Sequence, residues 1–271
     1  MALFSNVYSV IRQYLSMAVG DLISGTADSG TTTTLVSTLL RKADDYYNEH
    51  KYRCYIYGGT NIGEEREVSD WTLTSPANTL TLAPAYTAAI DNTSTYELHY
   101  IFTEDEYRKA VNMAIEALAG KYLINLTDDT TITLVADTWE YALPTSFLYL
   151  YNVVTEEDVA GDVFEAKDEV DSRDYSIIRS YPPYLKLHED LYTITAGKDL
   201  RLEGQGTQAI VTADTSVIYL PPFWVVQKAI TFLPKNKIQS NKLDDTYRQA
   251  LLLSAKEPRN WPHPKAKQIV E

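Results

Sequence analysis

Residues 103–122 read TEDEYRKAVNMAIEALAGKY, and this stretch carries the clearest structural signal in the chain. Thr103 and Glu106 have the spacing of a capping box, in which the threonine hydroxyl accepts the glutamate N–H and the glutamate side chain accepts the threonine N–H. Apolar side chains then recur at helical spacing, at Tyr107, Ala110, Val111, Ala114, Leu118 and Tyr122. They would share one face of a helix. We therefore predict a helix with one buried face over residues 103–126.

The N-terminal segment, residues 1–25, carries a second helical pattern, predicted to run over residues 3–23. Its apolar side chains also recur every three or four residues, at Val7, Val10, Ile11, Tyr14, Leu15, Ala18, Val19 and Leu22. Such a stripe must be covered, either by this chain or by a neighbouring one. We predict oligomer contacts through Val7, Ile11, Tyr14, Leu15 and Ala18.

Two stretches between the helical segments show the period of two that is typical of β-strands. Residues 26–102 are predicted to form a small antiparallel barrel or sandwich of roughly five strands. A short helix is expected within residues 35–47. Residues 127–220 are predicted to form a second antiparallel β region of short strands.

Helical patterns return over residues 221–258, where Pro221-Pro222 suits a first helical turn and Pro234 separates two helices. The tail, residues 259–271, has no core-forming pattern and is predicted to be an extended arm that is not needed for folding. The predicted fold class is therefore α+β. N-terminal, central and C-terminal helices form a helical bundle, and the two β regions project from it as insertions.

Composition limits the classes of function. The 271 residues contain a single cysteine, Cys54, and a formal charge of −13. One cysteine excludes an internal disulfide framework, and the acidic balance disfavours binding to nucleic-acid phosphates. A channel wall past which DNA slides would nevertheless be acidic or neutral. We expect no signal peptide and no membrane span, which needs about 18 consecutive apolar residues.

Tyrosine dominates the aromatic residues, with 21 Tyr against 6 Phe and 4 Trp. Tyrosine suits surfaces that become buried on association, although a β-rich core also favours it. The sequence therefore favours an interaction protein.

No strong catalytic motif is present. The chain lacks a phosphate-binding glycine loop, a Gly-x-Ser-x-Gly elbow and a His-Glu-x-x-His motif, and its four histidines are scattered. Carboxylates cluster at Glu64-Glu65, Glu156-Glu157-Asp158 and Asp168-Glu169-Asp171. Paired carboxylates can hydrolyse glycosides, but neighbouring acids on one loop usually point apart into solvent. We predict no catalytic residue, no metal and no cofactor.

Two segments resemble virion structural proteins of tailed bacteriophages. The first includes Gly25-Thr26-Ala27, Ala43-Asp44-Asp45-Tyr46-Tyr47, Gly63-Glu64-Glu65-Arg66, Val68-Ser69-Asp70 and Thr95-Tyr96-Glu97-Leu98-His99. The second, Tyr141-Ala142-Leu143-Pro144-Thr145-Ser146-Phe147-Leu148-Tyr149-Leu150, is similar to a run found in head–tail adaptor, or neck, proteins. Asp199-Leu200-Arg201-Leu202 before Leu220-Pro221-Pro222 continues it.

This resemblance implies a non-enzymatic connector of the virion neck or tail, assembled in the host cytoplasm. Adaptors of this kind form rings, typically twelve-fold, that enclose genomic DNA without reading its sequence. They combine a helical bundle with β insertions and join the portal protein to a tail or neck protein. The two β regions here are larger than in the smallest adaptors. A tail-tube or baseplate protein, a glycan-binding or glycan-cleaving tail protein and a host-derived β-rich binding module therefore remain alternatives.

The tail provides the candidate binding residues. Arg259, Trp261, Pro262, Pro264, Lys265 and Lys267 are predicted to bind the portal or the neighbouring subunit. The prolines disfavour a helix and lower the entropy lost on docking. Trp261 offers a large apolar anchor, and the basic residues would complement an acidic partner.

Overall fold

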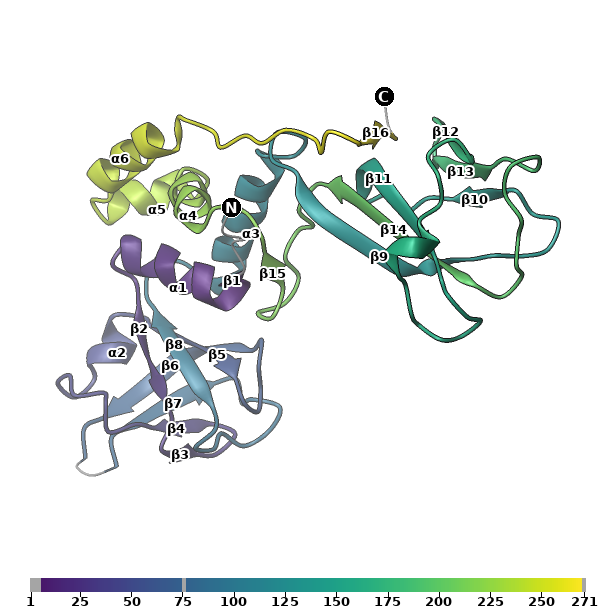
Figure 1. Cartoon of the computed structure of the whole chain (residues 1–271). Coiled ribbons are helices and arrows are strands. Elements are labelled where there is room, and N and C mark those ends of the chain that lie inside the picture. Colours follow the sequence, from purple (N-terminus) through teal and green to yellow (C-terminus); the bar gives the residue numbers. More distant parts are fainter. Residues whose placement is uncertain (1–5, 75–76, 270–271) are drawn as a thin grey trace. The chain divides into compact units, whose positions relative to one another are not determined.

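The computed structural model describes residues 6–74 and 77–269, and within these ranges the protein is β-rich (Figure 1). Sixteen strands form four sheets and six α-helices accompany them, with 30% of residues in strands and 22% in helices. The predicted helical bundle with inserted β regions is therefore wrong. The physical reason is that each β region encloses a hydrophobic cluster of its own, so neither depends on a helical frame.

The chain divides into two compact units. Unit 1 comprises Met1–Ala117 and Ile210–Glu257, and unit 2 comprises Leu118–Ala209 and Pro258–Glu271. Unit 1 thus contains the first β region and all six α-helices that the structure describes, whereas unit 2 contains the second β region and the C-terminal tail. Each unit is therefore built from two segments that are far apart in the sequence.

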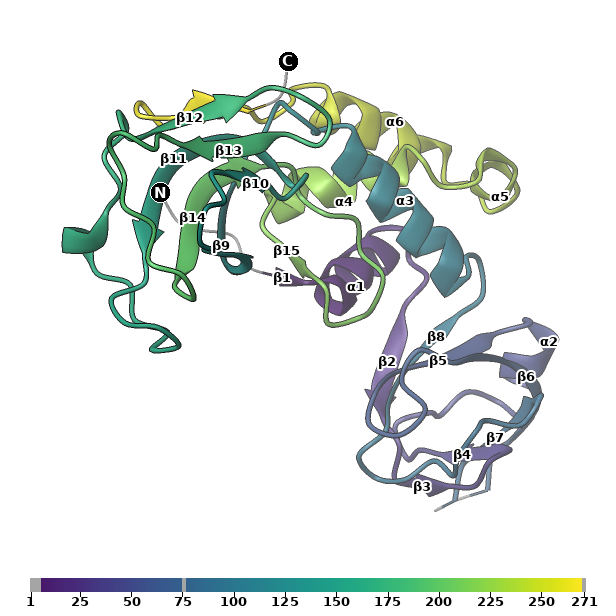
Figure 2. The same cartoon turned by 90° about the vertical axis from the view of Figure 1, so that its right-hand side faces the viewer.

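The sheet of unit 1 contains seven strands, all paired antiparallel, in the order β2-β8-β5-β6-β7-β4-β3. They are β2 (Ile23–Thr26), β3 (Ser29–Gly30), β4 (Thr34–Val36), β5 (Arg53–Gly58), β6 (Glu65–Thr72), β7 (Thr79–Ala83) and β8 (Thr95–His99). The sheet curves around a core that includes Trp71, Leu80 and Tyr96 (Figure 2). In β7 the buried residues, Leu80 and Leu82, alternate with partly exposed threonines, as the period of two predicts. The short helix α2 (Tyr46–Glu49) packs beside β6.

Helix α3 (Glu104–Glu116) begins as predicted. The Thr103 Oγ1 accepts the Glu106 N–H at 3.2 Å, and the Glu106 Oε2 accepts the Thr103 N–H at 2.9 Å, so the capping box is confirmed. Acidic side chains in the first turn also suit the positive end of the helix dipole. The helix ends ten residues before the predicted limit, and strand β9 already begins at Ile124.

Helix α1 (Tyr8–Ala18) is shorter than the predicted helix over residues 3–23. Strand β1 (Asn6–Val7) precedes it and pairs with β15 (Val217–Ile218), while residues 3–5 lie outside the described residues. Gly20 ends the helix with φ +72°, and the Asp21 N–H returns to the Ser16 carbonyl at 2.8 Å. A glycine in this left-handed conformation is a common helix terminator.

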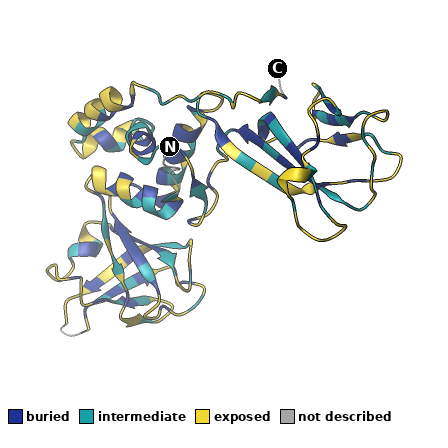
Figure 3. Ribbon diagram, in the orientation of Figure 1, coloured by how far each residue is buried: buried dark blue, intermediate teal, exposed yellow. Residues whose placement is uncertain are grey.

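The C-terminal helices of unit 1 are α4 (Pro222–Ile230), α5 (Lys235–Ser240) and α6 (Asp244–Ser254). Helix α4 contacts α1, α3 and α6, and its Val225 and Ala229 are fully buried. The two predicted helices of this segment are confirmed as α4 and α6, and the short helix α5 between them was not predicted. Helix α6, drawn largely in yellow in Figure 3, keeps an exposed apolar run at Leu251–Leu253.

Unit 2 contains two antiparallel sheets that share one hydrophobic cluster. The four-stranded sheet has the order β16-β11-β14-β9, and the three-stranded sheet the order β10-β13-β12. The strands are β9 (Ile124–Thr133), β10 (Glu140–Ala142), β11 (Phe147–Thr155), β12 (Tyr175–Ile178), β13 (Tyr184–Leu187), β14 (Asp199–Gly206) and β16 (Lys267–Gln268). A 3-10 turn, Ala166–Asp168, lies between β11 and β12. The second β region predicted from the sequence is therefore a small sandwich-like unit.

The contact between β11 and β14 requires glycine. A Cβ on Gly204 would overlap the Tyr149 carbonyl oxygen, and one on Gly206 would overlap the Ser146 carbonyl oxygen. The pairing of the two strands also shifts register in this stretch, between Phe147 and Tyr149. The two glycines let the backbones approach closely where the sheet is irregular.

Candidate functional site

Unit 1 contains a buried charged cluster centred on Arg12 of α1. The Arg12 Nε and Nη2 donate to the Glu97 carboxylate on β8 at 2.8 and 3.1 Å, and Nη1 donates to Asp214. The guanidinium carbon also lies 4.4 Å from the ring centroid of Tyr55. This bidentate contact between a guanidinium and a carboxylate is among the stronger polar interactions in proteins. It joins α1 to the sheet and to the loop that precedes β15.

Burial and nearby positive charge shift the pKa values of the acids in this cluster in opposite directions. Burial alone would raise the pKa of Glu97, but the hydrogen bond from His99 and the charge of Arg12 outweigh it and hold that pKa at about 2. Burial raises the pKa of Glu104, which accepts the Tyr8 hydroxyl at 3.0 Å. The cluster therefore fixes Glu97 as a carboxylate and leaves Glu104 easier to protonate.

His99 lies between two acceptors. Its Nε2 is 3.1 Å from the Glu97 Oε2, and its Nδ1 is 2.6 Å from the Asp21 carbonyl oxygen. Both hydrogen bonds form together only when both ring nitrogens carry a proton. The Asp21 carboxylate in turn accepts the N–H groups of Tyr100, Ile101 and Phe102 at 2.7 to 3.0 Å. These contacts hold the corner between β8 and α3.

The cluster is a structural junction. Arg12, Glu97 and His99 have no exposed surface, so a substrate cannot reach them. The sequence pattern alone does not reveal this role, because the partners of Arg12, Glu97 and Asp214, lie far away in the chain. The position of Arg12 in the buried face, beside Ile11 and one turn from Tyr8, was the available signal.

The predicted oligomer contacts of α1 divide into two groups. Ile11 and Leu15 are fully buried within unit 1, so they have no surface for another subunit. Val7 and Tyr14 are 36% and 47% exposed, and Ala18 is exposed as well. Contact with a second subunit stays a prediction for these three residues alone.

The C-terminal tail is extended, as predicted, but it packs on unit 2. The side chain of Asn260 exchanges two hydrogen bonds of 2.6 Å with the backbone of Leu123. The His263 N–H donates to the Gln205 side chain at 2.8 Å, and strand β16 then pairs with the outer edge of β11. Ile269 is fully buried in the hydrophobic cluster of unit 2. The expectation that the tail has no core-forming residue is therefore wrong, and we expect unit 2 to lose stability without the tail.

The structure separates the predicted binding residues of the tail. Trp261 is 87% exposed, and Arg259, Pro264 and Lys265 are also exposed, whereas Pro262 is partly buried. Lys267 is engaged within unit 2: its Nζ donates to the Ser172 carbonyl at 2.7 Å and lies 3.9 Å from the Tyr175 ring centroid. Burial lowers the pKa of Lys267. Trp261 thus remains the largest candidate anchor on the tail.

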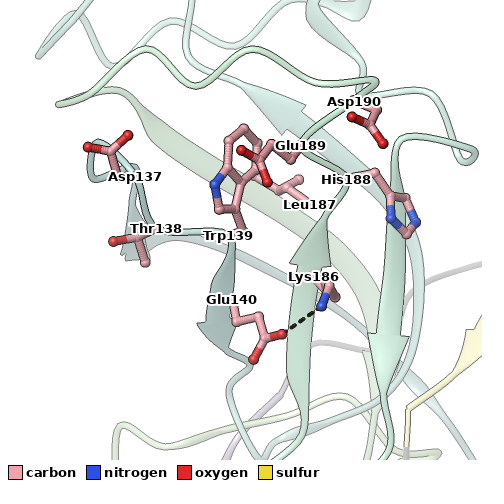
Figure 4. Close-up of a pocket in the computed structure, with 9 residues that line it drawn as sticks. All are labelled: Asp137, Thr138, Trp139, Glu140, Lys186, Leu187, His188, Glu189 and Asp190. Atoms are coloured by element: carbon pink, nitrogen blue, oxygen red, sulfur yellow. Dashed lines mark hydrogen bonds and ion pairs between the residues drawn. The ribbon is translucent and has the colours of Figure 1, made fainter.

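A second feature of unit 2 is an open cavity of about 490 Å³ beside β10 and β13. Its lining consists of Asp137, Thr138, Trp139, Glu140, Lys186, Leu187, His188, Glu189 and Asp190. Figure 4 shows Trp139 between Asp137 on one side and the strand that carries Lys186 on the other, with Lys186 donating to Glu140 at 2.9 Å. An aromatic ring surrounded by carboxylates could stack on a sugar ring and accept its hydroxyl groups.

The acidic clusters singled out in the sequence have separate local partners. Glu64 pairs with Arg66, and Asp171 pairs with Arg173. Glu156 holds a loop in place by accepting the N–H groups of Gly161, Asp162 and Asp199. Among the described residues, no group of three or more His, Cys, Asp or Glu side chains could hold a metal ion. Burial raises the pKa of Cys54 to about 12, which disfavours the reactive thiolate.

Comparisons with protein-family models, with curated proteins and with solved structures found no match for this chain. None of the helices in the described part of the chain has both the length and the apolar character of a membrane span.

Proposed function

We propose that the protein is a structural component of a tailed-phage particle, a connector that joins the portal to the tail without catalysing a reaction. The observation that carries this proposal is the C-terminal tail. It supplies a strand to an open sheet edge and carries an almost fully exposed tryptophan, at 87% exposure, between that strand and α6. Tryptophan is enriched among the residues that contribute most to binding between proteins.

The position of the neck-protein resemblance supports this proposal. The run over residues 141–150 forms most of β10, the turn after it and the first half of β11. Within this run, Tyr149 and Leu150 pair with Gln268 and Lys267 of the tail. The segment that resembles an adaptor is thus also the segment that receives the tail.

The proposed assembly is a homo-oligomeric ring, with twelve subunits as the resemblance implies, located in the neck of the virion. Its partners are the portal and a tail or neck protein. The ring would enclose genomic DNA without reading its sequence. A formal charge of −13 per chain suits a channel past which DNA slides, because an acidic wall does not hold the phosphates.

Electron microscopy of the purified protein, alone and mixed with its portal, tests the proposal. We expect closed rings in at least one of the two samples. Trp261→Ala should weaken binding to the portal by about 2 kcal/mol or more, and Tyr181→Ala, which truncates a similarly exposed aromatic residue, should not. A strictly monomeric protein under both conditions would refute the connector.

A glycan-binding tail protein is the second candidate function, favoured by the cavity around Trp139. Binding to host-surface polysaccharide would be measured by calorimetry with the intact protein. If this function holds, Trp139→Ala abolishes binding and Trp261→Ala does not. Absence of binding by the intact protein would remove this candidate.

A further inference from the structure

The tail belongs to unit 2 but follows directly on the last helix of unit 1. Helix α6 belongs to unit 1, whereas residues 258–269, including β16, belong to unit 2. We propose that in the assembled protein the tail of each copy completes unit 2 of a neighbouring copy, by exchange of β16. The partner of β16 is therefore a second copy of this chain. This inference identifies one partner of the proposed connector, and the ring in which the copies assemble rests on the proposed function.

The site that receives β16 is well defined. Tyr149 and Leu150 of β11 pair antiparallel with Gln268 and Lys267, and the Ile269 N–H donates to the Leu148 carbonyl at 2.9 Å. The opposite edge of β11 is already occupied by β14. An added strand on this edge gains main-chain hydrogen bonds, the usual basis of binding by strand addition.

The buried end of the tail makes this site dependent on an occupant. Ile269 has no exposed surface and packs in the same cluster as Leu150 and Val153. Without it, unit 2 would contain an apolar void and an unpaired strand edge, both of which cost stability. Every copy of unit 2 therefore needs a β16, but the contacts are the same whichever chain supplies it.

The segment before β16 permits exchange. Residues 255–259 contain no helix or strand and precede Asn260, which is held by Leu123 of unit 2, and five extended residues can span on the order of 17 Å. Pro262 and Pro264 keep the docked part of the tail from forming a helix. Exchange of an identical segment between subunits is a low-cost route to an oligomer, because no new interface must be created for the exchanged part.

Exchange would give a directional contact, from the tail of one copy to the sheet edge of the next. Repeated directional contacts form a ring when the rotation from copy to copy closes.

Cysteine pairing distinguishes exchange from docking of the tail on its own chain. Tyr149 and Gln268 face each other next to the hydrogen-bonded pair of Leu148 and Ile269, so they form a close, non-hydrogen-bonded pair suited to a disulfide. Chains that carry Tyr149→Cys alone and Gln268→Cys alone are co-expressed, purified as the assembled oligomer and oxidised. The native Cys54 is buried, so the unchanged protein gives the background level of disulfide formation.

We expect a disulfide-linked dimer that contains one chain of each variant. The matched control replaces Tyr149→Cys by Tyr181→Cys, an exposed tyrosine elsewhere in unit 2, and should give no such dimer. The double variant Tyr149→Cys/Gln268→Cys should give a ladder of linked chains. If it gives only an internal disulfide in each chain of the oligomer, or if the protein is a monomer with that internal disulfide, exchange is overturned.

The two proposals fail separately in this experiment. Rings whose double variant forms only internal disulfides would overturn exchange and leave the connector intact. Exchanged dimers that never close into rings, alone or with the portal, would support exchange and overturn the connector. Hydrogen exchange of unit 2 in each variant shows that the substituted strands remain folded.

Discussion

Replacing Arg12 by methionine should lower the free energy of unfolding of unit 1 by about 3–5 kcal/mol, because the change leaves buried carboxylates without their cation. Methionine keeps most of the length and the apolar stem of the side chain but removes its five N–H donors. The side chains of Arg12 and Glu97 have no exposed surface, and that of Asp214 is 3% exposed. Water therefore cannot replace the lost hydrogen bonds.

The size of the effect depends on the uncompensated charge. The double variant Arg12→Met/Glu97→Gln should recover part of the lost stability, since it replaces the unpaired Glu97 carboxylate with a neutral amide. Urea unfolding gives the free energy, and hydrogen exchange resolved by peptide assigns the loss to unit 1. Peptides from unit 2 should change less, because that unit has its own hydrophobic cluster.

Lys109→Met is the matched control. Lys109 also pairs with a carboxylate, Asp105, at 2.6 Å, but the two side chains are 72% and 54% exposed. An exposed pair of this kind contributes about 0.5 kcal/mol or less. If Arg12→Met costs no more than this control, the buried cluster is not the junction that we describe.

Four further changes test other features. Thr103→Ala should cost unit 1 about 1 kcal/mol in urea unfolding, because it removes the cap of α3. Gly204→Ala should destabilise unit 2 and speed hydrogen exchange of β11, since the new methyl group overlaps a backbone carbonyl. Ile269→Ala should cost unit 2 about 2–5 kcal/mol by the same measurements. Acidification should weaken unit 1: the folded pKa of Glu97, about 2, lies below its ordinary value of 4.5, so its contribution is complete above pH 4.5 and is lost as the pH falls through about 2.

Three of these tests have a control variant. Gly161→Ala should be tolerated, because a Cβ there lies 3.4 Å from its nearest neighbour, an ordinary contact. Trp261→Ala should leave the stability of unit 2 unchanged, since its side chain is exposed. Glu97→Gln should lose part of the acid dependence. An acid titration of Glu97→Gln parallel to that of the unchanged protein, or equal effects of Ile269→Ala and Trp261→Ala, would contradict the burial described here.

The features that the sequence predicted correctly depend on residues close together in the chain. The capping box needs only Thr103 and Glu106, three positions apart, and the buried face of α3 repeats along its 13 residues. The alternation of Leu80 and Leu82 with threonines likewise identifies a strand without further information. These patterns indicate that helices and strands form and which faces are buried, since they follow from the geometry of each element.

The fold class was predicted wrongly because the sequence does not state which elements pack together. Helical patterns at both ends and in the middle suggested a single bundle. The structure instead divides the chain at residues 117–118, 209–210 and 257–258, so that α1, α3 and α4 join the first β region and the tail joins the second. Each grouping depends on contacts between segments far apart in the chain.

The candidate binding residues also show that the sequence does not reveal contacts between distant segments. The sequence by itself determined that the tail is extended, from Pro262 and Pro264, and that Trp261 is available as an anchor. Only the tertiary structure decided that Ile269 fills the core of unit 2 and that Arg12 meets an aspartate 202 positions away. The physical reason is that local patterns fix the conformation of a segment, whereas burial and charge pairing are set by the segments that fold against it.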